Sequence, residues 1–273
     1  MVSEFIGLAV KFVKIINPFP MLFPLPATFP QVRLIATDVD GTLTQNGKFT
    51  PALLIALNDL AAAGIPVLLT TGRSAGWVNG LAEYLPVVGA IAENGAIFYK
   101  GQQGKGQHSQ LLVPIADVAT HRQALAKTFA SLQAAFPQIH ESSDNRFRMT
   151  DWTFDVKGLS VADLKELSDR AQSQGWGFTY STVQCHIRLA QQDKANGLEQ
   201  VLQRYFPELS KEDVVTIGDS PNDESLFNGD RFPVSVGVAN IRHYVDQIKY
   251  KPRFVTQAAE AEGFCELARS ILG

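Results

Sequence analysis

Val32-Arg33-Leu34-Ile35-Ala36-Thr37-Asp38-Val39-Asp40-Gly41-Thr42-Leu43 is the stretch that decides the fold. The apolar run 32–37 predicts a buried strand, and Gly41 lets the chain turn where that strand ends. Asp38 and Asp40 follow the strand, at the edge of an open α/β sheet where ligands bind. Two carboxylates so close repel each other unless a cation or phosphoryl chemistry brings them together. A turn with two solvated acids is the simpler alternative.

The composition is that of a globular protein. The chain has 273 residues, of which 45% are hydrophobic and 19% charged, so we expect one large domain or two modest ones around a real core. The net charge of −3 gives no reason to expect a nucleic-acid partner. Cys185 and Cys265 make neither a disulfide framework nor a zinc site and fit a reducing, cytoplasmic compartment. The sequence leaves the oligomeric state open.

Residues 1–30 read as an N-terminal extension. Apolar residues recur at helical spacing over 1–17, and five prolines then break any helix. No transmembrane segment is expected, since no stretch approaches the ~20 apolar residues that span a bilayer, and no signal peptide is evident. We expect an extension that packs on its own domain, is partly disordered, or follows a start codon placed too early. A peripheral membrane contact through 1–17 is the alternative.

Strand and helix patterns alternate on both sides of a central insert. Before it, strands at 32–37, 65–70 and 87–92 alternate with helices at 51–63 and 74–85. Thr50 and Gly64 are suitable residues to begin and end the first helix. After the insert, the expected elements are a helix at 195–205, strands at 214–217 and 234–238, a strand residue at Val255 and a helix at 258–272. This alternation predicts a doubly wound parallel sheet.

Residues 98–188 have a different pattern. A hairpin is expected around the polar, Gly-rich stretch 100–107, with its strands at 96–99 and 111–114. Helices at 116–136 and 161–174 and strand-like stretches at 147–156 and 178–189 follow. We therefore expect a core domain of residues 31–97 and 189–273 that is interrupted by an α/β insert of residues 98–188.

Three further signals stand at expected strand ends or helix starts. In Thr70-Thr71-Gly72-Arg73, a hydroxyl and free amides can hold a phosphate oxygen. Lys194 precedes a helix. In Gly218-Asp219-Ser220-Pro221-Asn222-Asp223, two more carboxylates suit Mg²⁺, although Ser220-Pro221 could simply begin a helix. Each signal is weak alone, because turns and surface lysines are common.

Together and in this order, the four signals resemble the haloacid dehalogenase superfamily. The likeness is to its Cof-type branch, subfamily IIB, which includes sucrose-phosphate phosphatases and phosphomannomutases. Residues 38–43 match the first motif, 71–73 the second, Lys194 the third, and 218–219 with 222–223 the fourth. Stretches 93–96 and 236–240 also fit, whereas Ala195 stands where the family often has glycine. The resemblance implies a Rossmann-like parallel core with an inserted α/β cap, here residues 98–188.

The resemblance also implies roles for these residues. Asp38 would attack phosphorus, and Asp40 would act as general acid and then general base. Mg²⁺ would bridge Asp38, the backbone carbonyl of Asp40, Asp219 and the phosphoryl group. Asp223 would orient Lys194 or a metal-bound water. The expected substrate-binding residues are Thr71, Gly72, Lys194 and Asn222.

The insert offers polar side chains that could choose the substrate. The candidates are Arg146, Arg148, Lys157, His186 and Arg188. Each is first read as a solvated strand residue and only second as a ligand contact, and Trp152 and Phe154 are read as core. Asn94, near the hinge of the insert, is a stronger candidate for a substrate or hinge contact.

The resemblance thus implies a Mg²⁺-dependent phosphatase of a small phosphorylated metabolite, expected to be a sugar phosphate, acting through an aspartyl-phosphate. A phosphomutase is an alternative, because it uses the same two aspartates. A catalytically silent binding or regulatory module is another, although the intact Asp38, Asp40, Lys194 and Asp219 argue against it. The sequence does not identify the substrate.

Overall fold

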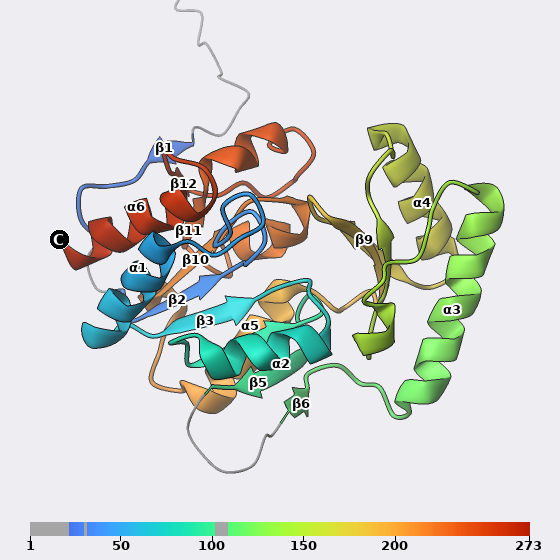
Figure 1. Ribbon diagram of the computed structural model, residues 1–273, viewed down its shortest axis with the longest axis horizontal. Coiled ribbons are helices and arrows are strands. Elements are labelled where there is room, and N and C mark those ends of the chain that lie inside the picture. The colour runs from blue at the N-terminus through green and yellow to red at the C-terminus, as the bar shows by residue number, and fades with distance from the viewer. Residues whose placement is uncertain (1–21, 30–31, 102–108) are drawn as a thin grey trace, which may run out of the picture.

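The computed structural model describes residues 22–29, 32–101 and 109–273. Two β-sheets organise them, a nine-stranded sheet in the order β1-β12-β11-β10-β2-β3-β4-β5-β6 and a three-stranded sheet in the order β7-β9-β8. Figure 1 shows the large sheet with α1, α2, α5 and α6 on one side of the molecule, and β9 with α3 and α4 on the other.

The bounds of the elements are as follows. The strands are β1 (Phe23–Pro24), β2 (Leu34–Thr37), β3 (Val67–Thr70), β4 (Gly89–Ala92), β5 (Ile97–Lys100), β6 (Ser109–Leu111), β7 (Trp152–Asp155), β8 (Gly177–Tyr180), β9 (Gln184–Arg188), β10 (Val214–Gly218), β11 (Val234–Gly237) and β12 (Phe254–Val255). The helices are α1 (Pro51–Ala62), α2 (Ala75–Tyr84), α3 (Val118–Ala135), α4 (Val161–Ser173), α5 (Lys194–Tyr205) and α6 (Glu260–Leu272). Short 3₁₀ helices are η1 (Asn145–Phe147), η2 (Lys211–Asp213), η3 (Pro221–Phe227) and η4 (Ala239–His243).

The large sheet confirms the predicted α/β fold. The neighbouring strands β1, β12, β11, β10, β2, β3 and β4 pair in parallel, whereas the described strands β5 and β6 pair antiparallel. Strand β2 lies between β10 and β3, and Thr37 is opposite Ile217 on one side and Leu69 on the other. Because parallel strands end at the same edge, the residues that follow β2, β3 and β10 meet there.

Helices cover both faces of the large sheet, because side chains of each strand point alternately to the two sides. Ile35 and Leu69 pack with the buried residues of α1, α2 and α6 in one apolar cluster. Leu34 and Leu68 pack with α5 in another. The sheet is therefore doubly wound, as predicted.

The local signals at helix α1 act as predicted. The Thr50 hydroxyl accepts a hydrogen bond from the Leu53 amide at 3.2 Å, and Pro51 occupies the first turn. Gly64 follows the helix with a positive φ of 75°, a conformation that glycine adopts without strain.

The predicted hairpin is strands β5 and β6, and it extends the large sheet, but its second strand ends at Leu111, where the predicted strand 111–114 begins. The rest of the insert, which we call the small-sheet unit (residues 118–188), packs α3 and α4 against the three-stranded sheet. Its core includes Phe129, Phe154 and Ile187, with Trp152 partly buried against it, so the reading of Trp152 and Phe154 as core is confirmed.

The predicted strand 147–156 is wrong in its first half. Residues 145–147 form η1, and β7 begins only at Trp152. Arg148, Thr150 and Asp151 are buried and bind polar partners from other parts of the chain. Those contacts replace the ladder of hydrogen bonds that a strand would need.

Residues 22–29, the described part of the predicted extension, lie against the large sheet. Strand β1 pairs in parallel with β12, and the rings of Phe29 and Phe254 meet edge to face at 5.6 Å. Residues 1–21, including the predicted membrane-surface segment 1–17, lie outside the described residues. Among those described, no helix combines the length and the apolar character that crossing a membrane would require.

Candidate active site

The carboxylates of the first and fourth motifs meet at the carboxyl edge of the large sheet. Asp38 follows β2 and its amide donates a hydrogen bond to Ile217 O at 2.9 Å, which ties it to β10. Asp219 follows β10, and Asp223 lies in η3. All three side chains are buried, and one oxygen from each lies within 4.8 Å of the others. Parallel pairing of β2 with β10 thus builds an acidic cluster from residues far apart in sequence.

Lys194 neutralises part of this charge. Its side chain is fully buried, and Nζ lies 2.5 Å from Asp38 Oδ1 and 2.6 Å from Asp223 Oδ1. Burial alone would lower the pKa of Lys194, but the carboxylates of Asp223 and Asp38 raise it above its usual value. Lys194 therefore stays a cation beside Asp38, one hydrogen bond from the predicted nucleophile.

Asp223 has both carboxylate oxygens occupied. Oδ1 accepts from Lys194, and Oδ2 accepts from the backbone amides of Asp219 at 2.9 Å and Ser220 at 3.1 Å. The last bond caps η3, so the Ser220-Pro221 helix start and the acidic motif coexist. Asp223 is thus placed to hold Lys194 and the loop of Asp219.

One carboxylate oxygen of Asp219 makes no hydrogen bond among the described residues. Its Oδ2 accepts from Asn240 Nδ2 at 2.8 Å, whereas its buried Oδ1 has no hydrogen-bond partner among the described residues. A Cβ on Gly41 would collide with this carboxylate, so only glycine fits there. An unpartnered carboxylate oxygen beside a second buried carboxylate fits the oxygen ligands that Mg²⁺ prefers.

The same burial makes these acids hard to ionise. Burial raises the pKa of Asp38 to about 7 against the opposing effect of Lys194, with the charges of Asp223 and Asp40 adding to the rise. Burial, then Asp38 and Asp223, also raise the pKa of Asp219 well above its usual value. A divalent cation held between Asp38 and Asp219 would offset this repulsion.

Asp40 is held by Arg73. The guanidinium donates two hydrogen bonds, from Nε to Oδ2 at 2.7 Å and from Nη2 to Oδ1 at 2.6 Å, and its carbon lies 4.9 Å above the Trp77 ring. The hydrogen bond to Asp40 is the main cause of a raised pKa of Arg73. The sequence placed Arg73 in the second motif but gave it no role. The TGR stretch itself was the available signal.

The second motif lies beside the acidic cluster. Thr71 is buried. Its hydroxyl accepts a hydrogen bond from the backbone amide of Arg73 at 3.1 Å, and its carbonyl accepts one from the backbone amide of Asn94 at 2.9 Å. Asn222 donates from Nδ2 to Asn94 Oδ1 at 3.1 Å. The sequence-predicted Thr71, Gly72 and Asn222 all line one cavity with Asp38 and Asp40.

The small-sheet unit closes this cavity. Ser181, Val183, Gln184 and His186, from β9 and the turn before it, form its opposite wall. The enclosed volume is about 10 Å³, roughly the room for one water. The cavity is therefore too small, in this arrangement of the two parts, for a phosphorylated metabolite.

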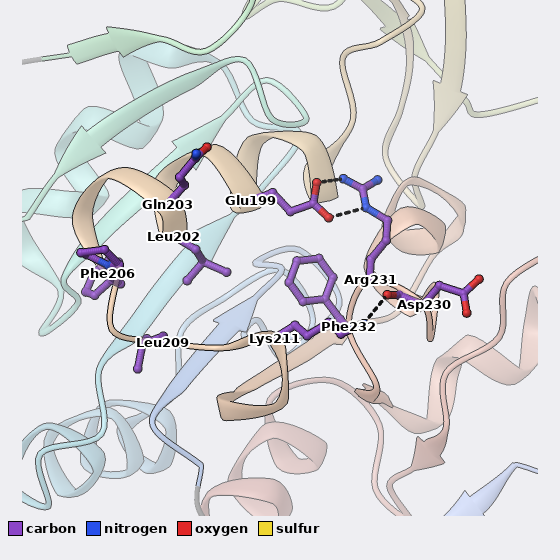
Figure 2. A pocket seen from close by; sticks show the side chains of 10 residues that line it. Glu199, Leu202, Gln203, Phe206, Leu209, Lys211, Asp230, Arg231 and Phe232 are labelled. Carbon is purple, nitrogen blue, oxygen red and sulfur yellow. Dashed lines mark hydrogen bonds and ion pairs between the residues drawn. The ribbon is translucent and has the colours of Figure 1, made fainter.

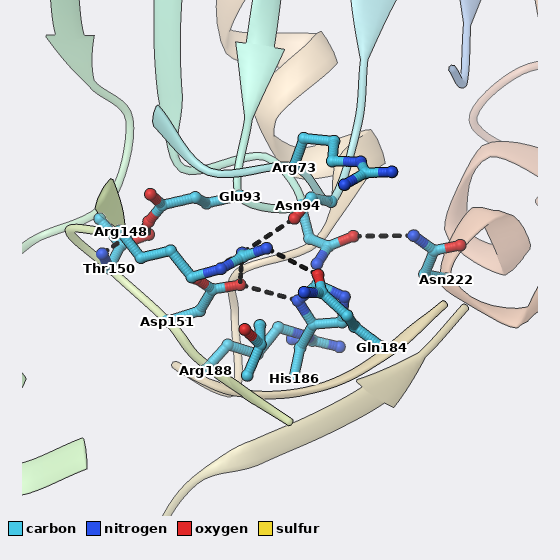
Figure 3. A network of polar contacts seen from close by, with 12 residues as sticks. Arg73, Glu93, Asn94, Arg148, Thr150, Asp151, Gln184, His186, Arg188 and Asn222 are labelled. Atoms are coloured by element: carbon cyan, nitrogen blue, oxygen red, sulfur yellow. Dashed lines mark hydrogen bonds and ion pairs between the residues drawn. The ribbon is translucent and has the colours of Figure 1, made fainter. Parts of the chain in front are cut away.

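A buried polar network joins the two parts of the molecule (Figure 3). Arg148 donates to the Gly72 carbonyl at 2.9 Å, to both oxygens of Asp151 at 3.0 Å, and to Gln184 Oε1 at 2.8 Å. His186 Nδ1 lies 2.8 Å from Asp151 Oδ2. The reading of Arg148 and His186 as solvated strand residues is therefore wrong, because both are buried against the second motif. Arg146 and Lys157 are exposed, as that reading expects, but Arg146 lies in η1 and Lys157 in the turn after β7, not in a strand, and Arg188 of β9 is half-buried.

Glu93 also links the small-sheet unit to the large sheet. It has a positive φ of 50° and a fully buried carboxylate. That carboxylate accepts from the amides of Ala75 at 2.9 Å, Met149 at 3.0 Å and Thr150 at 2.6 Å. One side chain thus binds the start of α2 and the segment that precedes β7.

Larger cavities lie elsewhere, away from the acidic cluster of Asp38, Asp219 and Asp223. The one in Figure 2 has about 430 Å³ and lies between the end of α5 and η2, which precedes the amino end of β10. Arg231 binds Glu199 there with two 2.7 Å hydrogen bonds, and Lys211 donates to the backbone carbonyl of Asp230 at 2.9 Å. The small cavity at the carboxyl edge is therefore the candidate active site.

Known proteins are similar to this chain in sequence and in fold. A family model described as haloacid dehalogenase-like hydrolase matches residues 35–132 and 140–266. Phosphoglycolate phosphatase 1 of Saccharolobus solfataricus is 29% identical over 246 residues, 88% of this chain and 96% of that protein. Phosphoglycolate phosphatase of Metallosphaera sedula is 30% identical over 201 residues, 72% and 81% of the two chains.

Two solved structures illustrate the shared fold. A crystal structure of a Thermoplasma acidophilum protein aligns with a TM-score of 0.69 at 21% identity, covering 87% of this chain and 96% of that one. The sucrose-phosphatase of Synechocystis, solved with sucrose and phosphate, aligns with a TM-score of 0.61 at 16% identity, covering 87% and 96%.

Proposed function

Since the chain belongs to the haloacid dehalogenase-like hydrolases and is an enzyme of the phosphatase type, we propose that it hydrolyses a small phosphorylated metabolite through an aspartyl-phosphate on Asp38. The observation that carries the proposal is the placement of Asp38. Its carboxylate lines the candidate cavity, lies 2.5 Å from the Lys194 ammonium, and shares that cavity with a second acid, Asp40. This placement supports a reaction in which a nucleophile, a phosphoryl-binding cation and a proton donor act on one phosphorus atom.

The reaction runs in two steps. In the first, a carboxylate oxygen of Asp38 attacks phosphorus, the bond from phosphorus to the ester oxygen breaks, and Asp40 gives a proton to the leaving oxygen. In the second, Asp40 takes a proton from a water that attacks the same phosphorus, which releases phosphate and restores the Asp38 carboxylate. Thr71, the Gly72 amide and Asn222 hold phosphoryl oxygens together with Lys194.

Mg²⁺ belongs to the proposal. Asp38, Asp219 and the backbone carbonyl of Asp40 would hold it, and Asp223 would keep Lys194 and the Asp219 loop in place. When bound, the cation supplies positive charge that offsets the repulsion between an anionic nucleophile and an anionic substrate. The unpartnered Asp219 Oδ1 supports this assignment.

The small-sheet unit is proposed as the cap. It closes the cavity, so it must open for substrate and then close to exclude water. Its residues contact the leaving group and choose the substrate, for which a sugar phosphate remains our expectation. The name of the phosphoglycolate phosphatases adds 2-phosphoglycolate as a competing candidate. A cytoplasmic location is part of the proposal and rests on two buried, unpaired cysteines.

Phosphate release from a panel of phosphorylated metabolites, with Mg²⁺ or with EDTA, tests the proposal. Wild type should release phosphate only with Mg²⁺, and Asp38→Asn should abolish release with the fold intact. Asp40→Asn should slow alkyl phosphates more than p-nitrophenyl phosphate, because a good leaving group needs less protonation. Asp59→Asn, on the exposed face of α1, is the matched control. Retained turnover in Asp38→Asn would exclude the aspartyl-phosphate, and activation by a sugar bisphosphate without phosphate release would indicate a mutase.

A further inference from the structure

Asn94 carries a hydrogen-bond donor with nothing to bind. The side chain is buried, and Nδ2 has no partner among the described residues. A buried amide hydrogen without an acceptor costs free energy. Asn94 also has a positive φ of 53°, which asparagine tolerates better than most residues. Asn94 binds Asn222, which lines the candidate cavity, so the unsatisfied donor lies next to that cavity, and a ligand that extends from it would supply the missing partner.

The orientation of the Asn94 amide follows from its neighbours. The Ser220 hydroxyl donates to Asn222 Oδ1 at 2.8 Å, and Asn222 Nδ2 donates to Asn94 Oδ1 at 3.1 Å. This chain of hydrogen bonds uses the oxygen of Asn94 and leaves its nitrogen free. Figure 3 shows the Asn94 oxygen turned to Asn222 and its nitrogen turned toward the side of His186.

His186 offers a hydrogen-bond acceptor, whereas Asn94 offers a donor. Arg148 binds both oxygens of Asp151, and with His186 it lowers the pKa of that acid although burial alone would raise it. An ionised Asp151 can only accept, so His186 Nδ1 carries the proton of their 2.8 Å hydrogen bond. Burial lowers the pKa of His186 despite Asp151, and the charges of Arg148 and Arg188 lower it further. In the neutral ring, Nε2 then bears a lone pair, and none of the described residues donates a hydrogen bond to it.

The Asn94 amide and the His186 ring both lie against Gly72. A Cβ placed on Gly72 would stand 3.2 Å from both Nδ2 and Oδ1 of Asn94 and 3.1 Å from His186 Cε1, the atom bonded to Nε2. Gly72 has no side chain there, and it lines the candidate cavity with Asp38, Asp40 and His186. A hydroxyl group can accept from Asn94 and donate to His186 at once, whereas a carboxylate has no proton to offer Nε2.

We propose that Asn94 and His186 together bind a hydroxyl group of the substrate beside its phosphoryl group, so that the enzyme prefers a polyol or sugar phosphate to a phosphorylated acid without hydroxyls. The inference rests on the proposed function and names the substrate class of that same site. Because His186 belongs to the small-sheet unit and Asn94 follows β4 of the large sheet, the two would bind one hydroxyl when the cap closes over a bound substrate, with a wider spacing than the cavity of about 10 Å³ allows. A substrate hydroxyl would thus favour closure.

Three probes with Mg²⁺ test the pair: sn-glycerol 3-phosphate, propyl phosphate, which has the same carbon chain without hydroxyls, and 2-phosphoglycolate. We expect wild type to favour glycerol phosphate over propyl phosphate by about 100-fold in kcat/KM, since a buried site built for a hydroxyl rejects analogues that lack it. His186→Asn keeps an amide at the position of Nδ1 for Asp151 but removes Nε2. Asn94→Gly removes the amide and tolerates the positive φ. Each should reduce the preference below about 10-fold.

His140→Asn, an exposed histidine of the small-sheet unit, is the control and should keep the wild-type ratio. Calorimetric binding of glycerol phosphate and propyl phosphate to Asp38→Asn, with and without His186→Asn, gives a second readout that needs no turnover. Equal kcat/KM for the first two probes, a preference for phosphoglycolate, or a preference that survives both substitutions would overturn the inference while leaving the phosphatase proposal intact. Absence of Mg²⁺-dependent release from every probe and from p-nitrophenyl phosphate would instead overturn the proposed function.

Discussion

Arg73 binds both carboxylate oxygens of Asp40 through hydrogen bonds of 2.6 and 2.7 Å, a bidentate contact that depends on the planar fork of a guanidinium. The carboxylate is therefore fixed in one orientation at the cavity wall before any substrate enters. General acid catalysis depends on the position of the proton donor, so in the proposed mechanism Arg73 would act on the reaction through Asp40.

Arg73→Lys should reduce kcat by roughly 10- to 100-fold, a fraction of the whole contribution of a general acid. The loss should be larger for alkyl phosphates than for p-nitrophenyl phosphate, since only the former need the proton. Steady-state kinetics on both substrates measures it, with Arg33→Lys on the protein surface as control. An equal loss on the two substrates would mean that Arg73 binds the phosphoryl group and does not position Asp40.

Lys194 should matter as much for stability as for activity. Lys194→Met leaves the buried carboxylates of Asp38 and Asp223 without their cation. Breaking a buried ion pair from one side destabilises by about 3–5 kcal/mol, which urea unfolding in EDTA at pH 7.5 would measure. Adding Asp223→Asn should restore part of the loss, because one of the unpaired charges disappears.

Lys165→Met is the matched control for Lys194. Its ion pair with Asp169 is a 2.8 Å contact between two exposed side chains, and such a pair contributes about 0.5 kcal/mol or less. A cost for Lys194→Met as small as that of Lys165→Met would show that Asp38 and Asp223 do not depend on this cation.

The sequence predicts well which acids meet at the carboxyl edge of the large sheet, for a physical reason. Asp38 and Asp219 each follow an uninterrupted apolar strand, and in a parallel sheet every such strand ends on the same side. Strand assignment therefore suffices to bring the two acids together, without any knowledge of side-chain packing. Likewise, Thr50 and Gly64 are local signals that act within one turn of the helix that they bound.

The polar network of the small-sheet unit could not be predicted in the same way. Arg148 and His186 stand among alternating residues, a pattern typical of a strand with one solvated face. Their burial depends on partners distant in sequence, such as the Gly72 carbonyl for Arg148. Charged side chains are buried only when paired, and a single sequence does not show which groups will pair.

Asp219→Asn should stabilise the protein without metal and remove its response to metal. Burial and the charges of Asp38 and Asp223 raise the pKa of Asp219, so its ionised form opposes folding. In EDTA, the variant should melt about 2–4 °C above wild type, the shift that roughly 1 kcal/mol gives for a chain of this size. Mg²⁺ should raise the Tm of wild type, by linkage to the folded state, and leave the variant unchanged.

Differential scanning calorimetry with and without Mg²⁺ gives both numbers for Asp219→Asn. Asp59→Asn, an exposed acid on α1, should behave as wild type in either condition. An equal rise of Tm on adding Mg²⁺ to wild type and to Asp219→Asn would place the cation at another site.

His186 should make the fold sensitive to acid. Burial holds its pKa in the folded protein below the ordinary 6.5, so the unfolded chain binds the proton more readily. The contribution of His186 to stability is therefore fully present above pH 6.5 and is lost as the pH falls through the lower folded value. His186→Asn lacks this titration. Urea unfolding from pH 7.5 to 5 should show wild type losing more stability than the variant.

The same protonation should change what the site binds. Below the folded pKa, Nε2 of His186 carries a proton and becomes a donor, so Asn94 and His186 together suit a carboxylate better than a hydroxyl. The ratio of kcat/KM for sn-glycerol 3-phosphate over that for 2-phosphoglycolate should therefore fall as the pH is lowered. Titration of the phosphate esters and of Asp38 affects both substrates and largely cancels in the ratio. In His186→Asn the ratio should be independent of pH, and a ratio that falls equally in this variant would assign the change to another group.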